Sequence, residues 1–171
     1  FGIVDALSAQ AKEFGIANIE LSAELNNLAN TVTVNTEVKF PFDVADGTYA
    51  LEYILVADGL KNSTWGQSNY YAGGGNGYPK YMDQFSKSND SELYGLTFND
   101  IAVQTSTIGG INNSVPANVN ADVPVSHKYT FNLSKAKNTS GKNVIQNKDN
   151  LKVVALLIDQ ATGKVVNANK V

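Results

Sequence analysis

The chain contains neither cysteine nor arginine, and each absence excludes a kind of chemistry. Without cysteine it can form no disulfide, no thiolate nucleophile and no cysteine-ligated metal centre. Its thirteen basic residues are all lysine, whereas bidentate recognition of phosphate or carboxylate groups is mostly the work of arginine. The net charge of −3 argues against a general attraction to nucleic acid. We therefore expect no nucleic-acid partner.

Long apolar segments are also missing. The longest uninterrupted one covers residues 153–158, far short of the roughly 20 residues that a membrane-spanning helix needs. We expect no transmembrane segment in this chain. Its 171 residues suit one domain with a self-sufficient core. Because the chain lacks an initiator methionine and opens at Phe1 inside a helical pattern, we expect it to be a piece of a longer protein.

Apolar residues near the start of the chain recur at helical spacing and predict one short helix over residues 3–14. Gly15 is a suitable stop for it. A helix of this length is marginal alone, so its apolar stripe must dock on the domain or on a preceding one. We assign residues 1–16 as a helix or linker, or as the end of a missing upstream domain, and residues 17–171 as the main domain. The apolar stripe consists of Ile3, Val4, Leu7, Ala11 and Phe14.

From Ile19 onwards the apolar residues recur at every second position. Residues 19–25 and 32–42 alternate in this way on either side of a turn at 26–30, which is typical of an antiparallel hairpin with one dry face. Residues 48–56 are apolar on both faces towards their end, as in a central strand. The predicted dry-face residues of the hairpin are Ile19, Leu21, Ala23, Leu25, Val32, Val34, Val38, Phe40 and Phe42.

Further strand patterns follow after an irregular middle part. Residues 94–103 are a weaker strand candidate with Leu96, Phe98 and Ile101 pointing inward, and residues 104–124 indicate a long connection. Residues 129–133 alternate again, and residues 151–158 are apolar on both faces before a turn and a return strand. We predict an all-β fold: an immunoglobulin-like antiparallel β-sandwich of about seven strands, preceded by the short N-terminal helix.

Residues 65–81 hold the only tryptophan, four of the eight tyrosines and five of the fourteen glycines. Consecutive glycines are too costly in backbone entropy for a regular element, and the rings are too much apolar area for an idle loop. Either the rings cover one end of the sandwich, or they form a partly exposed platform for a glycan or protein partner. The candidate platform residues are Trp65, Gln67, Asn69, Tyr70, Tyr71, Tyr78 and Tyr81.

Catalytic and metal-binding patterns are weak. His127 is the only histidine, has no nucleophile motif beside it, and is expected to be structural or exposed on the side of Tyr129. The glycines at 73–77 lack the lysine that a phosphate loop needs. Carboxylates could serve glycoside hydrolysis only as a facing pair with one member kept protonated, and most lie in turns or on solvent-facing strand positions. Those strand positions are Glu20, Glu24, Glu37 and Glu52.

Three groups of Asx residues could supply oxygen ligands to calcium, but none completes a calcium-loop motif. Asx side chains in turns usually cap their own backbone instead. We therefore predict no metal, no cofactor and no enzymatic activity. The three groups are Asp43 with Asp46; Asn118, Asn120 and Asp122; and Asn147 with Asp149.

Four stretches resemble the C-terminal half of the outer membrane protein 28 related family, cell-envelope lipoproteins of Bacteroides-type bacteria. They are Tyr-Ile-Leu-Val-Ala-Asp-Gly at 53–59, Trp-Gly-Gln-Ser-Asn-Tyr-Tyr at 65–71, Phe-Asn-Asp-Ile-Ala at 98–102, and Asn-Lys-Asp-Asn-Leu at 147–151 with the hairpin that follows to Ala168. The resemblance covers most of residues 45–171. It departs from the family at Ala57, where relatives often have glutamate, and at Val103, where they often have arginine.

The resemblance implies an exported protein at the outer membrane surface or in the periplasm of a Gram-negative bacterium, with a thioredoxin-like domain upstream of the sandwich. It implies no catalytic activity. We therefore expect a non-catalytic structural or partner-binding domain of an exported cell-envelope protein, with a protein or glycan partner at the cell surface. The alternative is a carbohydrate-binding module that uses the aromatic, glycine-rich loop.

Overall fold

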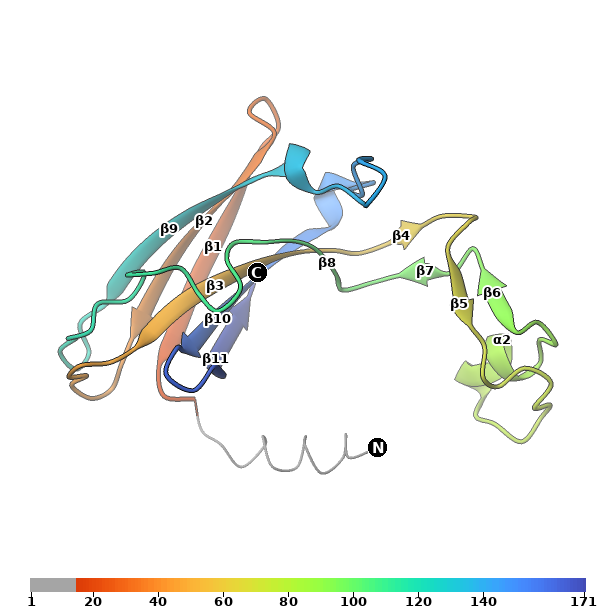
Figure 1. Cartoon of the computed structure of the whole chain (residues 1–171), viewed down its shortest axis with the longest axis horizontal. Coiled ribbons are helices and arrows are strands. Elements are labelled where there is room, and N and C mark those ends of the chain that lie inside the picture. The colour runs from red at the N-terminus through yellow and green to blue at the C-terminus, as the bar shows by residue number, and fades with distance from the viewer. Residues whose placement is uncertain (1–14) are drawn as a thin grey trace.

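The computed structural model describes residues 15–171, and this part of the chain is mostly β-structure in antiparallel sheets. The predicted all-β class is therefore confirmed, whereas the predicted helix over residues 3–14 lies outside the described residues. One sheet has the order β1-β2-β9 and the other β11-β10-β3-β8 (Figure 1). Their strands are β1 (Asn18–Asn26), β2 (Thr31–Lys39), β3 (Tyr49–Ala57), β8 (Ile101–Thr105), β9 (Val125–Asn132), β10 (Leu151–Asp159) and β11 (Lys164–Lys170).

The two sheets share one apolar core. On β2, Val32, Val34 and Val38 are buried and alternate with less buried residues, as the period of two predicts. β3 and β10 pair along nine residues each, from Leu151↔Ala57 to Asp159↔Tyr49, and lie in the middle of their sheet. This position explains why both strands are apolar on both faces, as predicted for a central strand.

Asparagine side chains connect the two sheets along one side. Asn169 on β11 donates from Nδ2 to the backbone oxygen of Ile19 on β1 at 2.7 Å, and Asn167 donates in the same way to Ala17. These bonds satisfy carbonyl groups of an edge strand that has no strand partner on that side.

Four predicted orientations are wrong. Ala23, predicted on the dry face, is exposed on the edge strand β1. Phe42 is half-exposed because β2 ends at Lys39 and the chain turns away after Pro41. Ile101 is also partly exposed, at the start of an edge strand. Glu52 is buried instead of solvent-facing, because the connection after β8 folds back over β3 and the backbone N–H of Gly109 donates to its Oε2 at 2.9 Å.

The irregular middle part projects away from both sheets (Figure 1). A two-stranded neck, β4 (Leu60–Lys61) paired with β7 (Thr97–Phe98), carries a lobe that comprises residues 62–96. The lobe contains β5 (Gly66–Ser68) paired with β6 (Glu92–Tyr94), the 3-10 helix η1 (Lys80–Met82) and the short helix α2 (Asp83–Ser86). The single strand predicted over residues 94–103 is therefore wrong, because this stretch is divided among β6, β7 and β8.

Two further 3-10 turns, η2 (Leu133–Lys135) and η3 (Lys148–Asn150), lie in the connection between β9 and β10. Asn132 and Asn147 cap them by accepting from the backbone N–H groups of Ser134 and Asp149. Among the described residues, no helix is long and apolar enough to cross a membrane.

Candidate functional site

The lobe is organised by polar groups. Among residues 62–96, all of which the structure describes, the buried side chains are Asn69 and Ser86. Its apolar side chains are half-buried at most, as at Trp65, Phe85 and Leu96, so the hydrophobic effect stabilises the lobe less than it stabilises the sheets. Hydrogen bonds therefore contribute much of what specifies its shape.

Asn69 is the centre of this hydrogen-bond network. Its Nδ2 donates to the backbone oxygens of Phe85 at 2.9 Å and Asp90 at 3.0 Å, and its Oδ1 accepts from the N–H of Tyr71 at 3.2 Å. Its own N–H donates to Ser91 at 2.7 Å. The prediction that Asn69 belongs to an exposed platform is therefore corrected, because its side chain is buried and its polar atoms bond within the lobe.

The glycine run lies along residues 86–88, at the end of α2. The N–H groups of Gly73 and Gly75 donate to the backbone oxygens of Ser88 at 2.8 Å and Ser86 at 2.9 Å. Both glycines have a positive φ, of 72° and 70°, which other residues rarely adopt. A Cβ on Gly74 would lie 2.6 Å from the Tyr78 ring, so this glycine allows the ring to pack on the loop.

The tyrosines of the lobe remain at its surface. Tyr70 is 94% exposed and Tyr81 78%, while Tyr71 and Tyr78 are about 40% exposed. Tyr71 is perpendicular to Tyr70, with 5.8 Å between ring centroids, and edge-on to Tyr78 at 5.2 Å. Edge-to-face rings form a ridge and not a flat platform. The interpretation that these rings cover one end of the main domain is wrong, since the lobe points away from both sheets (Figure 1).

The remaining candidates lie closer to the neck. Trp65 is half-buried against Phe98, with 6.0 Å between ring centroids. Gln67 is exposed on β5 and lines a hollow of about 330 Å³. Tyr94 was not among the predicted site residues. It is exposed beside Gly66 and donates to Glu92, whereas the predicted strand over residues 94–103 placed it on the same face as the inward-pointing Leu96 and Phe98. The hollow is lined by Gln67, Gln84, Phe85, Gly95, Leu96, Thr97 and Phe98.

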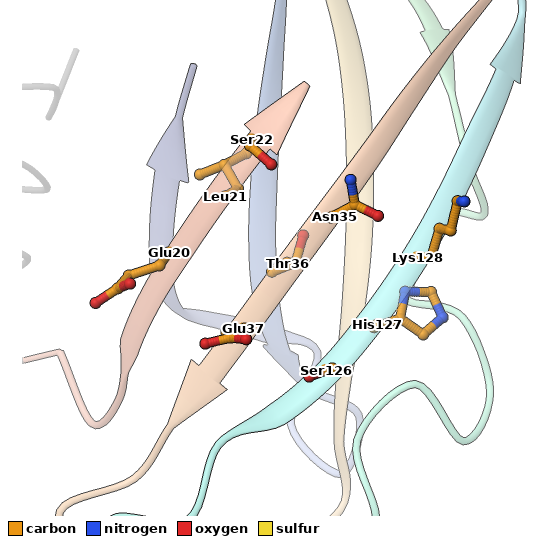
Figure 2. A pocket seen from close by; sticks show the side chains of 9 residues that line it. All are labelled: Glu20, Leu21, Ser22, Asn35, Thr36, Glu37, Ser126, His127 and Lys128. Atoms are coloured by element: carbon orange, nitrogen blue, oxygen red, sulfur yellow. The ribbon is translucent and has the colours of Figure 1, made fainter. Parts of the chain in front are cut away.

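A second hollow of about 470 Å³ crosses the outer face of the three-stranded sheet (Figure 2). One of its walls carries Glu20 and Glu37, which are directly opposite each other on β1 and β2. The other wall carries Ser22, Asn35 and Lys128. Both carboxylates are exposed to solvent, and they lie side by side on neighbouring strands instead of facing each other across a cleft, as a glycosidase pair does.

His127 lies at the inner side of this sheet. Its Nδ1 is 2.9 Å from the hydroxyl of Tyr53, and its ring is stacked on that of Tyr53, which also stacks on Tyr129. The predicted orientation of His127 on the side of Tyr129 is confirmed. Burial lowers the pKa of His127 and raises the pKa of the Tyr53 hydroxyl. These contacts give His127 a packing role.

The Asx groups cap backbone. Asp43 accepts from the N–H of Ala121 at 2.7 Å, and Asn118 accepts from the N–H of Asp46 at 3.2 Å. In the part of the chain that the structure describes, no group of three or more His, Asp or Glu side chains is placed to hold a metal ion.

Comparisons of the chain with protein-family models, with curated proteins and with solved structures gave no match. The resemblance to the outer membrane protein 28 related family therefore stays a prediction.

Proposed function

We propose that this chain is a non-catalytic, partner-binding domain of an exported bacterial cell-envelope protein, and that the lobe is its contact surface. The observation that carries the proposal is the exposure of Tyr70 and Tyr81 in a lobe that projects away from both sheets. Tyrosine presents an apolar ring with a polar tip, which makes it a frequent anchor at interfaces.

The proposed setting follows the resemblance to the outer membrane protein 28 related family, which includes a thioredoxin-like domain upstream. Of the resembling stretches, residues 65–71 fall on the lobe, and residues 98–102 run from the end of the neck into β8. We also propose that the two sheets form an immunoglobulin-like sandwich. Support comes from the packing of a three-stranded and a four-stranded antiparallel sheet on one core.

The chemistry of the lobe favours a protein partner. Residues 66–78 consist almost entirely of Gly, Tyr, Asn and Ser, the mixture that antibody paratopes use because tyrosine gives rigid contact area and the small residues give adaptable hydrogen bonds. The perpendicular rings of Tyr70, Tyr71 and Tyr78 form a ridge that fits a concave protein surface better than a flat glycan chain.

A carbohydrate-binding module is the alternative, and the hollow at Gln67 favours it. There the amides of Gln67 and Gln84 lie beside the apolar side chains of Phe85 and Phe98, a combination suited to a small polar ligand. The absence of catalysis in the proposal is supported by the exposure of Glu20 and Glu37 and by the packing role of His127.

Photo-crosslinking in the bacterium that makes the protein tests the contact surface. A benzophenone amino acid replaces Tyr81 in one variant, Tyr70 in a second, and the exposed Glu24 on β1 in a control. We expect discrete crosslinked products from the two lobe positions and none from Glu24. Equal crosslinking at all three positions, or none at the lobe, would overturn the proposal.

A glycan array separates the two partner classes. Binding to the array is measured for the intact domain, for a Gln67→Ala variant and for a Tyr81→Ser variant. Binding that Gln67→Ala abolishes would favour the carbohydrate alternative, whereas the absence of any glycan signal, together with lobe crosslinks to protein, supports the protein partner.

A further inference from the structure

The ribbon that carries the lobe contains a break. On one side β3 ends at Ala57 and β4 begins at Leu60, and on the other β7 ends at Phe98 and β8 begins at Ile101. Residues 58–59 and 99–100 are outside both ladders, and they face each other between the sheet and the neck. A two-stranded ribbon is weak alone, and an interrupted ladder is where such a ribbon would bend.

Both strands change direction at this break. Gly59 has a φ of 71° and Asp100 a φ of 54°, so both residues adopt the left-handed conformation. Such a conformation is uncommon for a residue other than glycine, and it persists where surrounding contacts specify it. The contacts around Asp100 must therefore be strong enough to specify the bend.

Side chains replace the missing ladder across the break. The N–H of Gly59 donates to Oδ1 of Asn99 at 2.9 Å, and the N–H of Asp100 donates to Oδ1 of Asp58 at 2.7 Å. Each strand thus supplies an acceptor to the other, as backbone carbonyls do in a regular antiparallel pair. The N–H of Asp58 also donates to the backbone oxygen of Asn150 at 3.0 Å.

Two groups from outside the ribbon complete the arrangement. Lys152, on the neighbouring strand β10, forms ion pairs with Asp58 and, at 3.3 Å, with Asp100. Gln146 binds the backbone of Lys61 on β4 at both ends of its amide, accepting from N–H at 3.0 Å and donating to the carbonyl at 2.8 Å. Its amide therefore bonds to Lys61 as a backbone amide of a neighbouring strand would.

We infer that these groups form a clamp, made of Asp58, Asn99, Gln146 and Lys152, that holds the lobe in one direction relative to the sheets. Lys152 connects the ribbon to β10, and Gln146 connects it to the segment that precedes β10. Its purpose rests on the proposed partner binding, because a pre-oriented contact surface loses less entropy on binding. These four are positioning residues.

Double electron–electron resonance tests the clamp without a partner. Since the chain has no cysteine, Glu24→Cys on β1 and Lys80→Cys on the lobe provide one clean pair of spin labels. We expect a narrow distance distribution with the clamp intact. Asp58→Ala combined with Gln146→Ala should broaden it by about twofold or more, because the first change removes the bond to Asp100 across the break and the second removes both bonds to Lys61 in the neck.

Matched variants separate positioning from folding. Asp58→Asn retains the Oδ1 acceptor for Asp100 but loses the ion pair with Lys152, so its distribution should be narrower than that of Asp58→Ala. A second label pair within the sheets, at Glu24 and Lys164, should be unchanged in every variant. If the double variant fails to fold, Gln146→Ala alone gives the comparison.

A broad distribution in the intact protein, or an equal width in Asp58→Ala, Gln146→Ala and the parent, would overturn the clamp. These results do not depend on crosslinking, so the clamp can fail while the lobe remains the contact surface. The lobe can equally fail as a contact surface while the clamp is confirmed.

Discussion

The two sheets and the lobe differ in what holds them in shape. Each of β2, β3 and β10 buries three or more apolar side chains, whereas the lobe buries only Asn69 and Ser86 among its residues 62–96. The sheets are therefore stabilised by area removed from water and the lobe by hydrogen bonds. A segment without a core is free to leave its aromatic rings at the surface. The comparison thus separates the part of the chain that provides stability from the part available for contact.

The largest expected effect belongs to the core. Leu157→Ala removes a fully buried side chain of β10 and should lower the free energy of unfolding by about 2–5 kcal/mol, since it leaves a cavity. Urea denaturation followed by circular dichroism measures the change. A loss below 1 kcal/mol, by the same order-of-magnitude scale, would mean that the sheets are not packed as described.

Asn69→Ala should act on the lobe alone. Loss of its amide leaves three backbone groups without partners and should lower the free energy of local opening by about 1–3 kcal/mol. Hydrogen exchange at the amides of Gly73 and Gly75 reports this opening, with the amides of β3 as the control. If protection falls equally in β3, the lobe and the sheets unfold as one unit, which would contradict their separate stabilisation.

Acidification should weaken the sheets more than the lobe. Burial holds the pKa of His127 below its ordinary value of 6.5. At a pH between the folded and the unfolded pKa of His127, the unfolded chain binds more protons than the folded one, so stability rises with pH in this range. The stabilising contribution of neutral His127 is complete above pH 6.5 and is lost as the pH falls through the folded pKa. Urea unfolding of the parent and of His127→Gln at descending pH measures the effect. The variant should lack this step, and a step of equal size in both would assign it to other groups.

The smallest effect on stability is expected from Tyr70→Ser. Because the ring is almost fully exposed, the free energy of unfolding should change by no more than about 0.5 kcal/mol. Crosslinking from position 81 should nevertheless fall if Tyr70 belongs to the contact surface. A variant that binds as the parent does would remove Tyr70 from that surface.

The strands of the two sheets could be predicted from the sequence because side-chain alternation is a local property. Val32, Val34 and Val38 indicated the dry face of β2, and the apolar residues on both faces of β3 and β10 indicated central strands, as the structure confirms. The alternation failed at Phe42 and Ile101, which lie beyond or at the end of regular pairing.

The burial of Glu52 and Asn69 could not be predicted in this way. Glu52 occupies an ordinary polar position on β3, and it is buried because Gly109, far along the chain, returns over that face. Asn69 has the composition of a surface loop around it, but its partners are the carbonyls of Phe85 and Asp90. Neither partner is recognisable before the chain is folded.

By itself, the sequence determined the all-β class and the central strands. It excluded the chemistry that cysteine and arginine would have supplied. It also marked residues 65–81 as unusual through their tyrosines and glycines. The tertiary structure alone decided that these rings point away from the sheets. That direction depends on the bend at Gly59 and Asp100 and on contacts with Gln146 and Lys152, residues more than 40 positions away along the chain. Composition and periodicity are local, whereas exposure is the result of which distant segments meet.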